Sequence, residues 1–276
     1  MIVKRAFGGL FMPEQDSLTS LPPFFMSSVP KSGTHLLHQL LNGIPNVSMN
    51  INDSIKKFFL GAVLASDAYY EALYQDHRSR LNLLKENEFG LGHVRYSSKY
   101  EDMLKEANKK HVFLYRDPRD VLVSLAYFIG EKWLFHPLHH QFQTTTDVKD
   151  RLRMLIQGVP GLWPDFNTYI SSFYGWVDVE DVHKIRFEQL VESSKSRRVA
   201  LGKLLDFLYD HALRDQLKEQ IVNDMIANID TSKSFTFRSG KISGWKREFD
   251  EELKELFKSQ SNLLLTNLGY ETDDNW

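Results

Sequence analysis

The sequence predicts an α/β fold in which a parallel sheet carries helices on both faces. Two short apolar runs, at 24–29 and 111–115, each end in a turn that a helix-periodic stretch follows at once. Strands that alternate with helices in this way are typical of parallel sheets. With 276 residues, 42% of them hydrophobic, the chain can bury a sizeable core. Its informative segments are spread along the whole length and have to meet at one site, so we expect a single domain, 1–276.

The expected elements follow one another along the chain without an internal repeat or a low-complexity tract. Residues 1–20 are expected to form a loose arm. The remaining expectations are a strand, loop and helix over 23–45; helical structure over 53–88, with apolar positions that include Ile55, Phe58, Phe59, Ala62 and Val63; a helix beginning at 100–105; a strand ending at Arg116; a helix beginning near Pro118; a strand at 183–187; and amphipathic helices over 195–228 and 250–267.

The most informative segment is the turn that follows the first apolar run. Lys31-Ser32-Gly33-Thr34 lies between that run and a new helical stretch. A tight turn there directs backbone N–H groups and a helix N-terminus at one spot, which favours a phosphate or sulfate. It is not a Walker A loop, because that loop has its lysine after the second glycine, whereas Lys31 precedes Gly33. An ordinary strand–helix turn with a surface lysine is the alternative.

A second segment places an arginine at the end of the other apolar run. Arg116 comes where a parallel strand ends, the edge at which open α/β sheets bind ligands. Pro118 suits the first turn of the following helix, and Ser124 lies two turns further along. Both Arg116 and Ser124 can reach one anion. In the alternative interpretation, Arg116 pairs with Asp117 or Asp120.

The third segment, 235–246, combines glycines, serines and cations near Trp245. Glycine makes such a loop flexible, and Arg238 can bind a phosphate through two nitrogens at once. The alternative is an exposed basic loop before the last helix.

In this order and spacing, the segments resemble the sulfotransferases that use 3′-phosphoadenosine-5′-phosphosulfate (PAPS). Residues 30–35 are similar to P-K-S-G-T-T; 116–124 to R-N/D-P-K/R-D-x-x-x-S; 186–190 to R-Y-E-D-L; 238–246 to R-K-G-x-x-G-x-W-K; and Gly92-His93-Val94-Arg95-Tyr96 to G-H-L-P-Y. The resemblance spans about residues 23–270 and implies a fold like that of the P-loop nucleotide kinases.

The resemblance also implies the roles of individual residues. Lys31 would neutralise the leaving phosphate, and His93 would take the acceptor proton, with His35 as the main rival for that role. The residues implied for binding PAPS are Lys31, Ser32, Gly33, Thr34, His35, Leu36, Arg116, Ser124, Phe187, Arg238, Ser239 and Gly240. Three of these depart from the family pattern: Leu36 replaces an adenine-stacking tryptophan, Phe187 a tyrosine and Ser239 a lysine. The adenine contacts are therefore expected to differ.

Residues 130–165 mix aromatics, histidines, prolines and glycines without a clear period, and they are the expected acceptor-side loop region. There, Trp133, Phe135 and Trp163 either wall a pocket or form core. His136, His139 and His140 lack a completing Cys or carboxylate, so they are interpreted as a surface cluster. No metal is expected.

Two other functions are alternatives to sulfuryl transfer. A P-loop-like kinase for nucleotides or small molecules would need a Walker-type lysine and a magnesium ligand, and neither is placed correctly. A protein that binds an adenosine bisphosphate without catalysis would keep the loop but lack a base, and His93 argues against it.

Composition narrows the expected partners and compartment. A net charge of −2 without a basic face argues against nucleic acid, and zero cysteines exclude disulfides and thiol catalysis. No apolar run approaches the roughly 18 residues of a membrane span. We therefore expect a small-molecule acceptor such as a secondary metabolite, no nucleic-acid or membrane partner, and a cytoplasmic location.

Overall fold

The computed structural model describes residues 20–59, 66–230, 232 and 240–276. Within them, a five-stranded sheet has the order β2-β3-β1-β4-β5, and every pair of neighbouring strands is parallel. The strands are β1 (Phe24–Ser28), β2 (Lys57–Phe59), β3 (Phe89–His93), β4 (His111–Tyr115) and β5 (Val182–Arg186). The predicted α/β class and parallel sheet are thereby confirmed.

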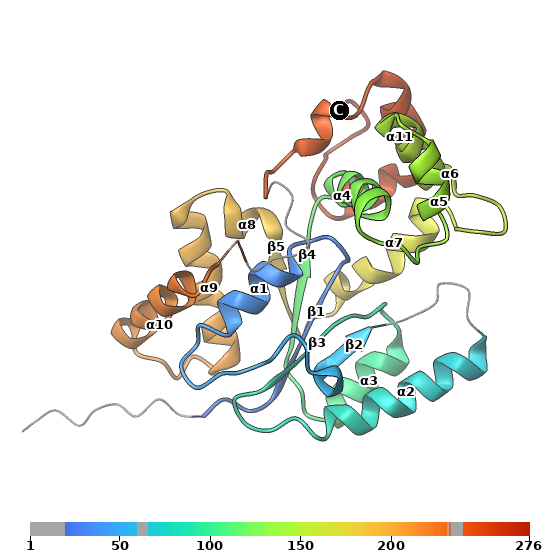
Figure 1. Ribbon diagram of the computed structural model, residues 1–276. Coiled ribbons are helices and arrows are strands. Elements are labelled where there is room, and N and C mark those ends of the chain that lie inside the picture. The colour runs from blue at the N-terminus through green and yellow to red at the C-terminus, as the bar shows by residue number, and fades with distance from the viewer. Residues whose placement is uncertain (1–19, 60–65, 231, 233–239) are drawn as a thin grey trace, which may run out of the picture.

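Helices connect the strands and cover both faces of the sheet (Figure 1). They are α1 (Thr34–Leu41), α2 (Asp67–Leu81), α3 (Ser98–Glu106), α4 (Pro118–Glu131), α5 (His139–Thr144), α6 (Val148–Gln157), α7 (Phe166–Tyr174), α8 (Phe187–Val191), α9 (Ser194–Leu208), α10 (Asp215–Ala227) and α11 (Glu251–Asn267), with short 3-10 turns η1 (Ser54–Lys56), η2 (Gly175–Asp178) and η4 (Gly244–Arg247). Side chains cap several helix starts, for example Ser97 at α3 and Asp250 at α11.

The alternation of side chains along the strands produces two hydrophobic cores. Phe24 and Met26 of β1 face one side with α1, α9 and α10, whereas Phe25 faces the other side with α3, α4, α7 and α11. In Figure 1 these two sets of helices lie on opposite sides of the sheet. Strands with apolar residues on both faces are what a sheet covered on both sides requires.

The topology sets the position of a site at the carboxyl edge of the sheet. β1 lies in the middle, with β3 on one side and β4 on the other. The turn after β1 therefore lies between connections that leave in opposite directions, where open α/β sheets bind their ligands. His93 ends β3, and Arg116 directly follows β4, which ends at Tyr115, one residue before the predicted strand end; both lie at this same edge.

Three expectations about elements need correction. Phe58 and Phe59 belong to strand β2 and not to a helix, although α2 does occupy 67–81. The stretch 195–228 forms two helices, α9 and α10. The expected loop region 130–165 contains the helices α5 and α6. Ala62, Val63 and the arm up to residue 19 lie outside the described residues.

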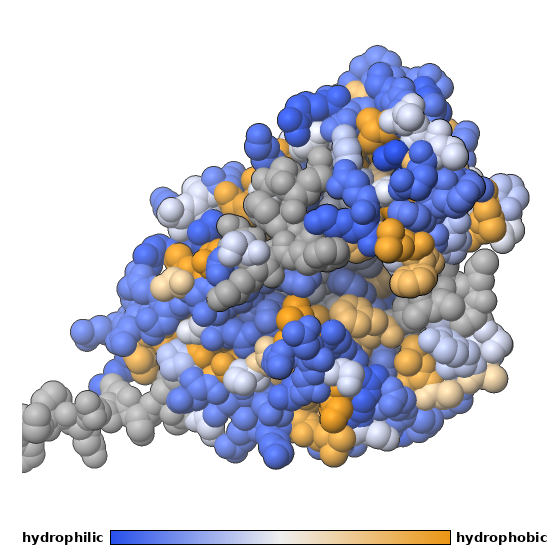
Figure 2. Space-filling view, viewed as in Figure 1, coloured by the Kyte–Doolittle hydropathy of each residue, from blue (hydrophilic) through white to orange (hydrophobic). Residues whose placement is uncertain are grey.

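In the described part of the chain, no helix is both long and apolar enough to cross a bilayer. On the face drawn in Figure 2, hydrophilic residues predominate and the hydrophobic ones form small, separate patches.

Candidate active site

The turn between β1 and α1 has a backbone that only certain residues tolerate. Lys31 has φ 68° and Gly33 has φ 95°, both in the left-handed region. A Cβ at Gly33 would lie 2.5 Å from Cδ2 of Phe187, so glycine is required both by conformation and by space. The turn therefore depends on a contact with Phe187, the first residue of α8, which is distant in sequence.

This turn presents unpaired donors at one point. Within the described residues, the backbone N–H groups of Gly33, Thr34 and His35 have no hydrogen-bond acceptor, as expected at a helix start without a side-chain cap. The hydroxyl of Ser32 is buried and also lacks a partner. Together with the positive end of the helix dipole, these donors fit an anionic group such as a phosphate.

Lys31 adds a full positive charge beside these donors. Its Nζ lies 3.7 Å from the centroid of the Phe128 ring of α4, a cation–π contact. The positive charge of Lys31 is close enough to lower the pKa of both His93 and His35, in addition to the larger effect of burial. Phe128 thus holds the ammonium group near the turn and near both histidines.

His93, at the end of β3, is held in one orientation by Ser28 at the end of β1. Its Nδ1 lies 2.9 Å from the Ser28 carbonyl oxygen and 3.1 Å from the Ser28 hydroxyl, which in turn is 2.7 Å from the Thr34 hydroxyl. Because a carbonyl only accepts, Nδ1 carries the proton and Nε2 is the basic atom. Burial lowers the pKa of His93 to about 4, so its ring is neutral near pH 7.

Arg116 connects the three segments that the sequence singled out. Its guanidinium donates to the carbonyl of Lys241 at 2.7 Å, approaches the carbonyl of Lys31 at 3.5 Å, and pairs with Asp120 at 3.2 Å. The ion pair between Arg116 and Asp120 is the one that the alternative interpretation of the sequence predicts. It coexists with the contacts that Arg116 makes to the carbonyls of Lys31 and Lys241. The Nε of Arg116 is buried without a partner, which leaves one donor for a ligand.

Asp120, at the start of α4, fixes the loop that precedes α11. Its carboxylate accepts from the backbone N–H of Ser243 at 3.0 Å and of Trp245 at 2.9 Å. Burial raises the pKa of this carboxyl. Ser124 lies one turn further along α4 and is half-buried. Gly240 has φ 59°, whereas Arg238 and Ser239 lie outside the described residues.

Phe187 packs against two parts of the site, the turn at Gly33 and the guanidinium of Arg116. The Arg116 guanidinium carbon lies 4.4 Å from the centroid of the Phe187 ring, and the same ring fills the space beside Gly33. The neighbouring Glu188 accepts from the N–H of Asp117 at 3.1 Å and from the hydroxyl of Tyr270 at 3.1 Å. The residues that directly follow β5 therefore fix the positions of the turn at Gly33 and of Arg116 relative to each other.

His35 and Leu36 differ in what surrounds them. His35 is half-buried, and burial is the main cause that lowers its pKa. Leu36 packs against the core formed by α1, α9 and α10. The structure thus brings Lys31, His93 and Arg116 to one edge, while Leu36 is partly used in packing.

The histidines of the 130–165 region do not form a surface cluster. His136 is buried, with its ring 4.5 Å from Trp133 and 4.2 Å from Trp163, and His139 hydrogen-bonds the carbonyl of Ile129 at 2.7 Å. Phe135, by contrast, is 95% exposed. In the described ranges, no group of three or more His, Asp or Glu side chains is placed to hold a metal ion.

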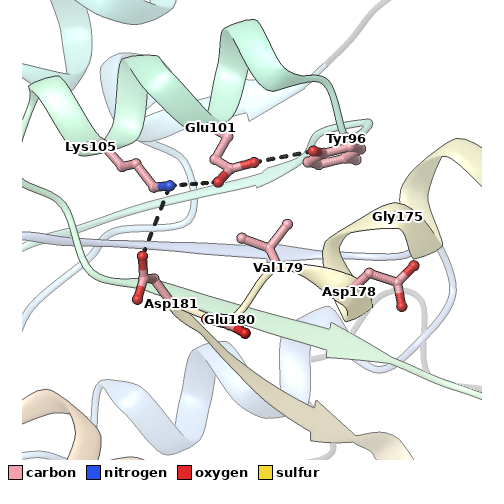
Figure 3. Close-up of a pocket in the computed structure, with 8 residues that line it drawn as sticks. All are labelled: Tyr96, Glu101, Lys105, Gly175, Asp178, Val179, Glu180 and Asp181. Atoms are coloured by element: carbon pink, nitrogen blue, oxygen red, sulfur yellow. Dashed lines mark hydrogen bonds and ion pairs between the residues drawn. The ribbon is translucent and has the colours of Figure 1, made fainter.

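A separate pocket of about 390 Å³ lies beside α3 (Figure 3). It is lined by Tyr96, Glu101, Lys105, Gly175, Asp178, Val179, Glu180 and Asp181. Lys105 pairs with Glu101 at 2.7 Å and approaches Asp181 at 3.9 Å. Carboxylates outnumber the cation here, and residues 179–181 precede β5 at the amino edge of the sheet, so this pocket does not suit an anionic donor.

Sequence reasoning missed three residues that complete the carboxyl-edge site: Ser28, Asp120 as the anchor of a loop, and Phe128. Ser28 is a polar residue in an otherwise apolar run, which was a readable signal. Asp120 acts through its bonds to Ser243 and Trp245, and Phe128 through its contact with Lys31. These partners are far away along the chain, so the local sequence gives no signal of either role.

Comparison with known proteins gives one matching family and a larger set of solved structures with a similar fold, two of which are described below. The family model described as "Sulfotransferase domain" matches residues 21–268. The mouse sulfotransferase SULT7A1, solved in complex with PAP, has 18% identity and a TM-score of 0.54, with 87% of this chain and 85% of that chain covered. A retinol dehydratase in complex with retinol and PAP has 18% identity and a TM-score of 0.51, with 89% and 81% covered. Among curated proteins, none matches the sequence.

Proposed function

The chain belongs to the sulfotransferase family, and on this premise we propose that it moves a sulfuryl group from PAPS to a hydroxyl or amine of a small-molecule acceptor. The donor supplies an activated sulfuryl group whose leaving group is a phosphate. An in-line transfer requires three features of the protein: donors that bind the phosphates, a positive charge at the leaving group, and a base that takes the proton of the acceptor.

One observation carries the proposal for the donor. The guanidinium of Arg116 contacts the carbonyls of both Lys31 and Lys241, so the three motif segments meet at one point. Their unpaired donors, the hydroxyl of Ser32 and Nε of Arg116, are suited to phosphate oxygens. The two similar structures were both solved with PAP, which agrees with this assignment.

We assign the donor contacts by segment. The unpaired N–H groups of Gly33, Thr34 and His35, with the hydroxyl of Ser32, would hold the 5′-phosphate side, and Arg116, Ser124, Arg238, Ser239 and Gly240 the 3′-phosphate. The N–H groups of Ser32 and Leu36 already bond the carbonyls of Val29 and Gly33. Phe187 would act through its support of Gly33 and Arg116. Arginine suits a phosphate because its planar fork offers two parallel donors.

His93 would accept the acceptor's proton at Nε2. The Ser28 carbonyl holds Nδ1–H, which fixes the ring and stabilises the imidazolium once the proton arrives. Lys31 would neutralise charge that grows on the leaving phosphate, where a positive group has its largest effect on rate. The donor's negative charges would also raise the pKa of His93 from its low value and strengthen it as a base.

Thermal denaturation with added nucleotides tests the donor assignment. Adenosine 3′,5′-bisphosphate (PAP) should raise the Tm, because a ligand that binds only the folded state stabilises it. AMP should do so far less, since it lacks the 3′-phosphate that Arg116 would bind. Equal shifts with both nucleotides, or no shift with either, would reject the assignment.

Finer features of the proposal follow the same reasoning. Residues 130–165 are assigned to the acceptor side, on the half-buried Trp133 and the exposed Phe135, whereas Trp163 is buried in the core. A reaction of this kind needs no metal ion, because lysine and backbone dipoles provide the positive field. The cytoplasmic location stays a prediction.

A further inference from the structure

A chain of hydrogen bonds joins His93 to the turn that follows β1. Nδ1 of His93 lies 3.1 Å from the hydroxyl oxygen of Ser28, and that oxygen lies 2.7 Å from the hydroxyl oxygen of Thr34, the first residue of α1. Ser28 is fully buried, and Thr34 is only 9% exposed. Water is thus largely kept away from these groups, so the hydrogen bonds between them are stronger than they would be at the surface.

The direction of these hydrogen bonds follows from the protons available. Nδ1 also lies 2.9 Å from the carbonyl oxygen of Ser28, which only accepts, so Nδ1 carries a proton and shares it between the carbonyl and the hydroxyl oxygen. A protonated Nδ1 has no lone pair for the Ser28 hydroxyl, whose proton therefore goes to Thr34. The reverse arrangement would leave the buried proton of Ser28 without an acceptor among the described residues, which costs free energy.

The hydroxyl of Thr34 then has a proton left to donate. Its oxygen accepts from Ser28, and within the described ranges it has no second partner. The unpaired backbone N–H groups of Gly33, Thr34 and His35 belong to the same turn. A phosphate bound there would accept the Thr34 proton, and every donor from Nδ1 to Thr34 would then point toward its negative charge. Hydrogen bonds aligned in one direction polarise and strengthen one another.

Most other groups around His93 oppose its protonation or carry no charge. Burial lowers the pKa of His93 most, and the positive charges of Lys31 and His35 lower it further. The bond to the Ser28 carbonyl acts in the opposite direction. From β2, the uncharged ring of Phe59 packs on His93 at a centroid distance of 5.1 Å. A negative charge at the turn would favour the charged ring, and the two hydroxyls form a hydrogen-bonded path from the turn to that ring.

We propose that Ser28 and Thr34 are positioning residues whose hydroxyls carry the effect of a phosphate bound at the turn to His93, so that the base becomes stronger once the donor is in place. No proton moves along this path. The acceptor's proton goes to Nε2 while the acceptor bonds to sulfur and the bond from sulfur to the leaving phosphate breaks, and Nδ1 keeps its own proton throughout. This inference rests on the proposed function.

Histidine NMR tests the proposal on the full chain without turnover. The Cε1–H signal of His93, assigned by its loss in His93→Asn, is followed from pH 8 to 4.5 with and without saturating PAP. PAP should raise the pKa of His93 by about one unit or more, the usual effect of an opposite charge at close range. Adenosine 3′-monophosphate has no 5′-phosphate for the turn, so it should raise this pKa far less.

Two variants interrupt the path, and two others control for the substitution itself. In Ser28→Ala and Thr34→Val, each saturated with PAP, most of the pKa shift should be lost, whereas Thr34→Ser keeps a hydroxyl and should keep the shift. Ser28→Ala retains the carbonyl contact, so nitrogen chemical shifts should still report a proton on Nδ1. Ser27→Ala is the matched control, because Ser27 makes a similar bond, 2.7 Å long, to the buried ring of His111; it should show the native shift.

Turnover provides a second measurement, which a merely structural role would not change in the same way. With PAPS and an acceptor that the native protein sulfates well, Ser28→Ala should lower kcat roughly tenfold, a part of what a positioned base contributes, and should move the acid limb of the kcat profile to lower pH. A loss of rate without a move of that limb would count against the proposal.

Three results of the NMR experiment would overturn the inference: PAP leaves the pKa of His93 unchanged in the native protein, Ser28→Ala keeps the full shift, or Ser27→Ala loses it as well. Binding of PAP is measured on every variant by thermal denaturation. If PAP fails to stabilise the native protein, the proposed function fails. If PAP binds normally and the shift does not depend on the two hydroxyls, only the inference about Ser28 and Thr34 fails.

Discussion

At the scale of single residues, Lys31 carries the clearest expectation. Lys31→Ala should lower turnover by about two to three powers of ten, the typical loss when one charge-stabilising group is removed from a transition state. Binding of PAP should weaken less, because the backbone donors of the turn and Arg116 remain. Steady-state kinetics and a PAP titration measure both quantities.

Lys99→Ala is the matched control, since Lys99 is an exposed lysine that pairs with Glu71 on the surface. It should leave turnover and PAP binding unchanged. A Lys31→Ala protein with near-native turnover would show that the charge over Phe128 has no part in the reaction.

The histidine base is tested by a pair of substitutions. His93→Asn should reduce turnover roughly a hundredfold or more, the usual contribution of a positioned base, while PAP affinity stays near native. His35→Ala should instead alter PAP affinity more than the chemical step, because His35 lends a backbone N–H at the start of α1. Turnover and PAP titrations on both variants distinguish the two roles.

His211→Asn, at an exposed histidine outside the proposed site, controls for the loss of an imidazole as such. Native rates in His93→Asn with an acceptor that the native protein sulfates well would mean that the base lies elsewhere. Reversed effects in the two variants would make His35 the base.

The sequence was sufficient to predict those site residues whose role depends on neighbours within a few positions. Lys31 and Gly33 are readable because a strand, a turn and a helix follow one another within a few residues. Ser28 and Phe128 are not, because they act by meeting His93 and Lys31, which are far away along the chain. Arg116 shows both aspects: its place at a strand end was predictable, whereas its contact with Lys241 was not.

At the scale of elements, the loop before α11 depends on one carboxylate. Asp120→Asn should lower the free energy of unfolding by about 1–3 kcal/mol, because a buried charged acceptor for two backbone N–H groups and for Arg116 is lost. PAP binding should weaken as well, since the Lys241 carbonyl that meets Arg116 belongs to the same loop. Urea unfolding and PAP titration measure these effects.

Glu252→Gln is the control, because Glu252 is an exposed carboxylate that pairs with Arg153 at 2.9 Å. It should change stability by no more than a surface ion pair contributes, less than about 1 kcal/mol. Unchanged stability and PAP binding in Asp120→Asn would show that the loop does not need this anchor.

The sequence predicted the ends of an element where a local residue, such as a proline, marks them, and it did not predict them where no such residue is present. Pro118 marks the start of α4, as expected. By contrast, α9 ends without a glycine or proline: Asp210 and His211 adopt φ values of 51° and 59°, so the break before α10 has no usual signal. β2 has three residues and, among the described residues, pairs with β3 alone; its Phe58 and Phe59 stand at helical spacing from Ile55, which made the segment resemble a helix.

At the scale of the whole molecule, the parallel sheet followed from the alternation of strands and helices, but the order of strands did not. Five strands allow many parallel orders, and the choice depends on how the crossovers pack. Burying residues on both faces also places polar side chains deep inside. His111 is enclosed by Ser27 and Trp176, and His77 by Phe58 and Tyr100.

These buried histidines should make the fold sensitive to mild acid. Burial lowers the pKa of His111 to about 3 and of His77 to about 4, below the value near 6.5 of an unfolded chain. Above pH 6.5 both states are neutral at these groups. Between pH 6.5 and about 4 the unfolded chain takes up protons that the folded one refuses, so stability falls by up to about 1.4 kcal/mol per pH unit for each histidine.

Urea unfolding at a series of pH values from 7.5 to 4.5 measures this loss, with the His77→Gln variant beside the native protein. The variant should be less stable at pH 7.5, because the hydrogen bond between the His77 ring and the Tyr100 hydroxyl is altered, but its stability should fall less steeply with acid. Other titrating groups, such as Glu188 with its raised pKa, contribute equally to both proteins and cancel in the difference. His140→Gln, at an exposed position, should keep the native slope. Identical slopes for the native protein and His77→Gln would mean that the buried ring is protonated in the folded state, and the acid sensitivity would then have another origin.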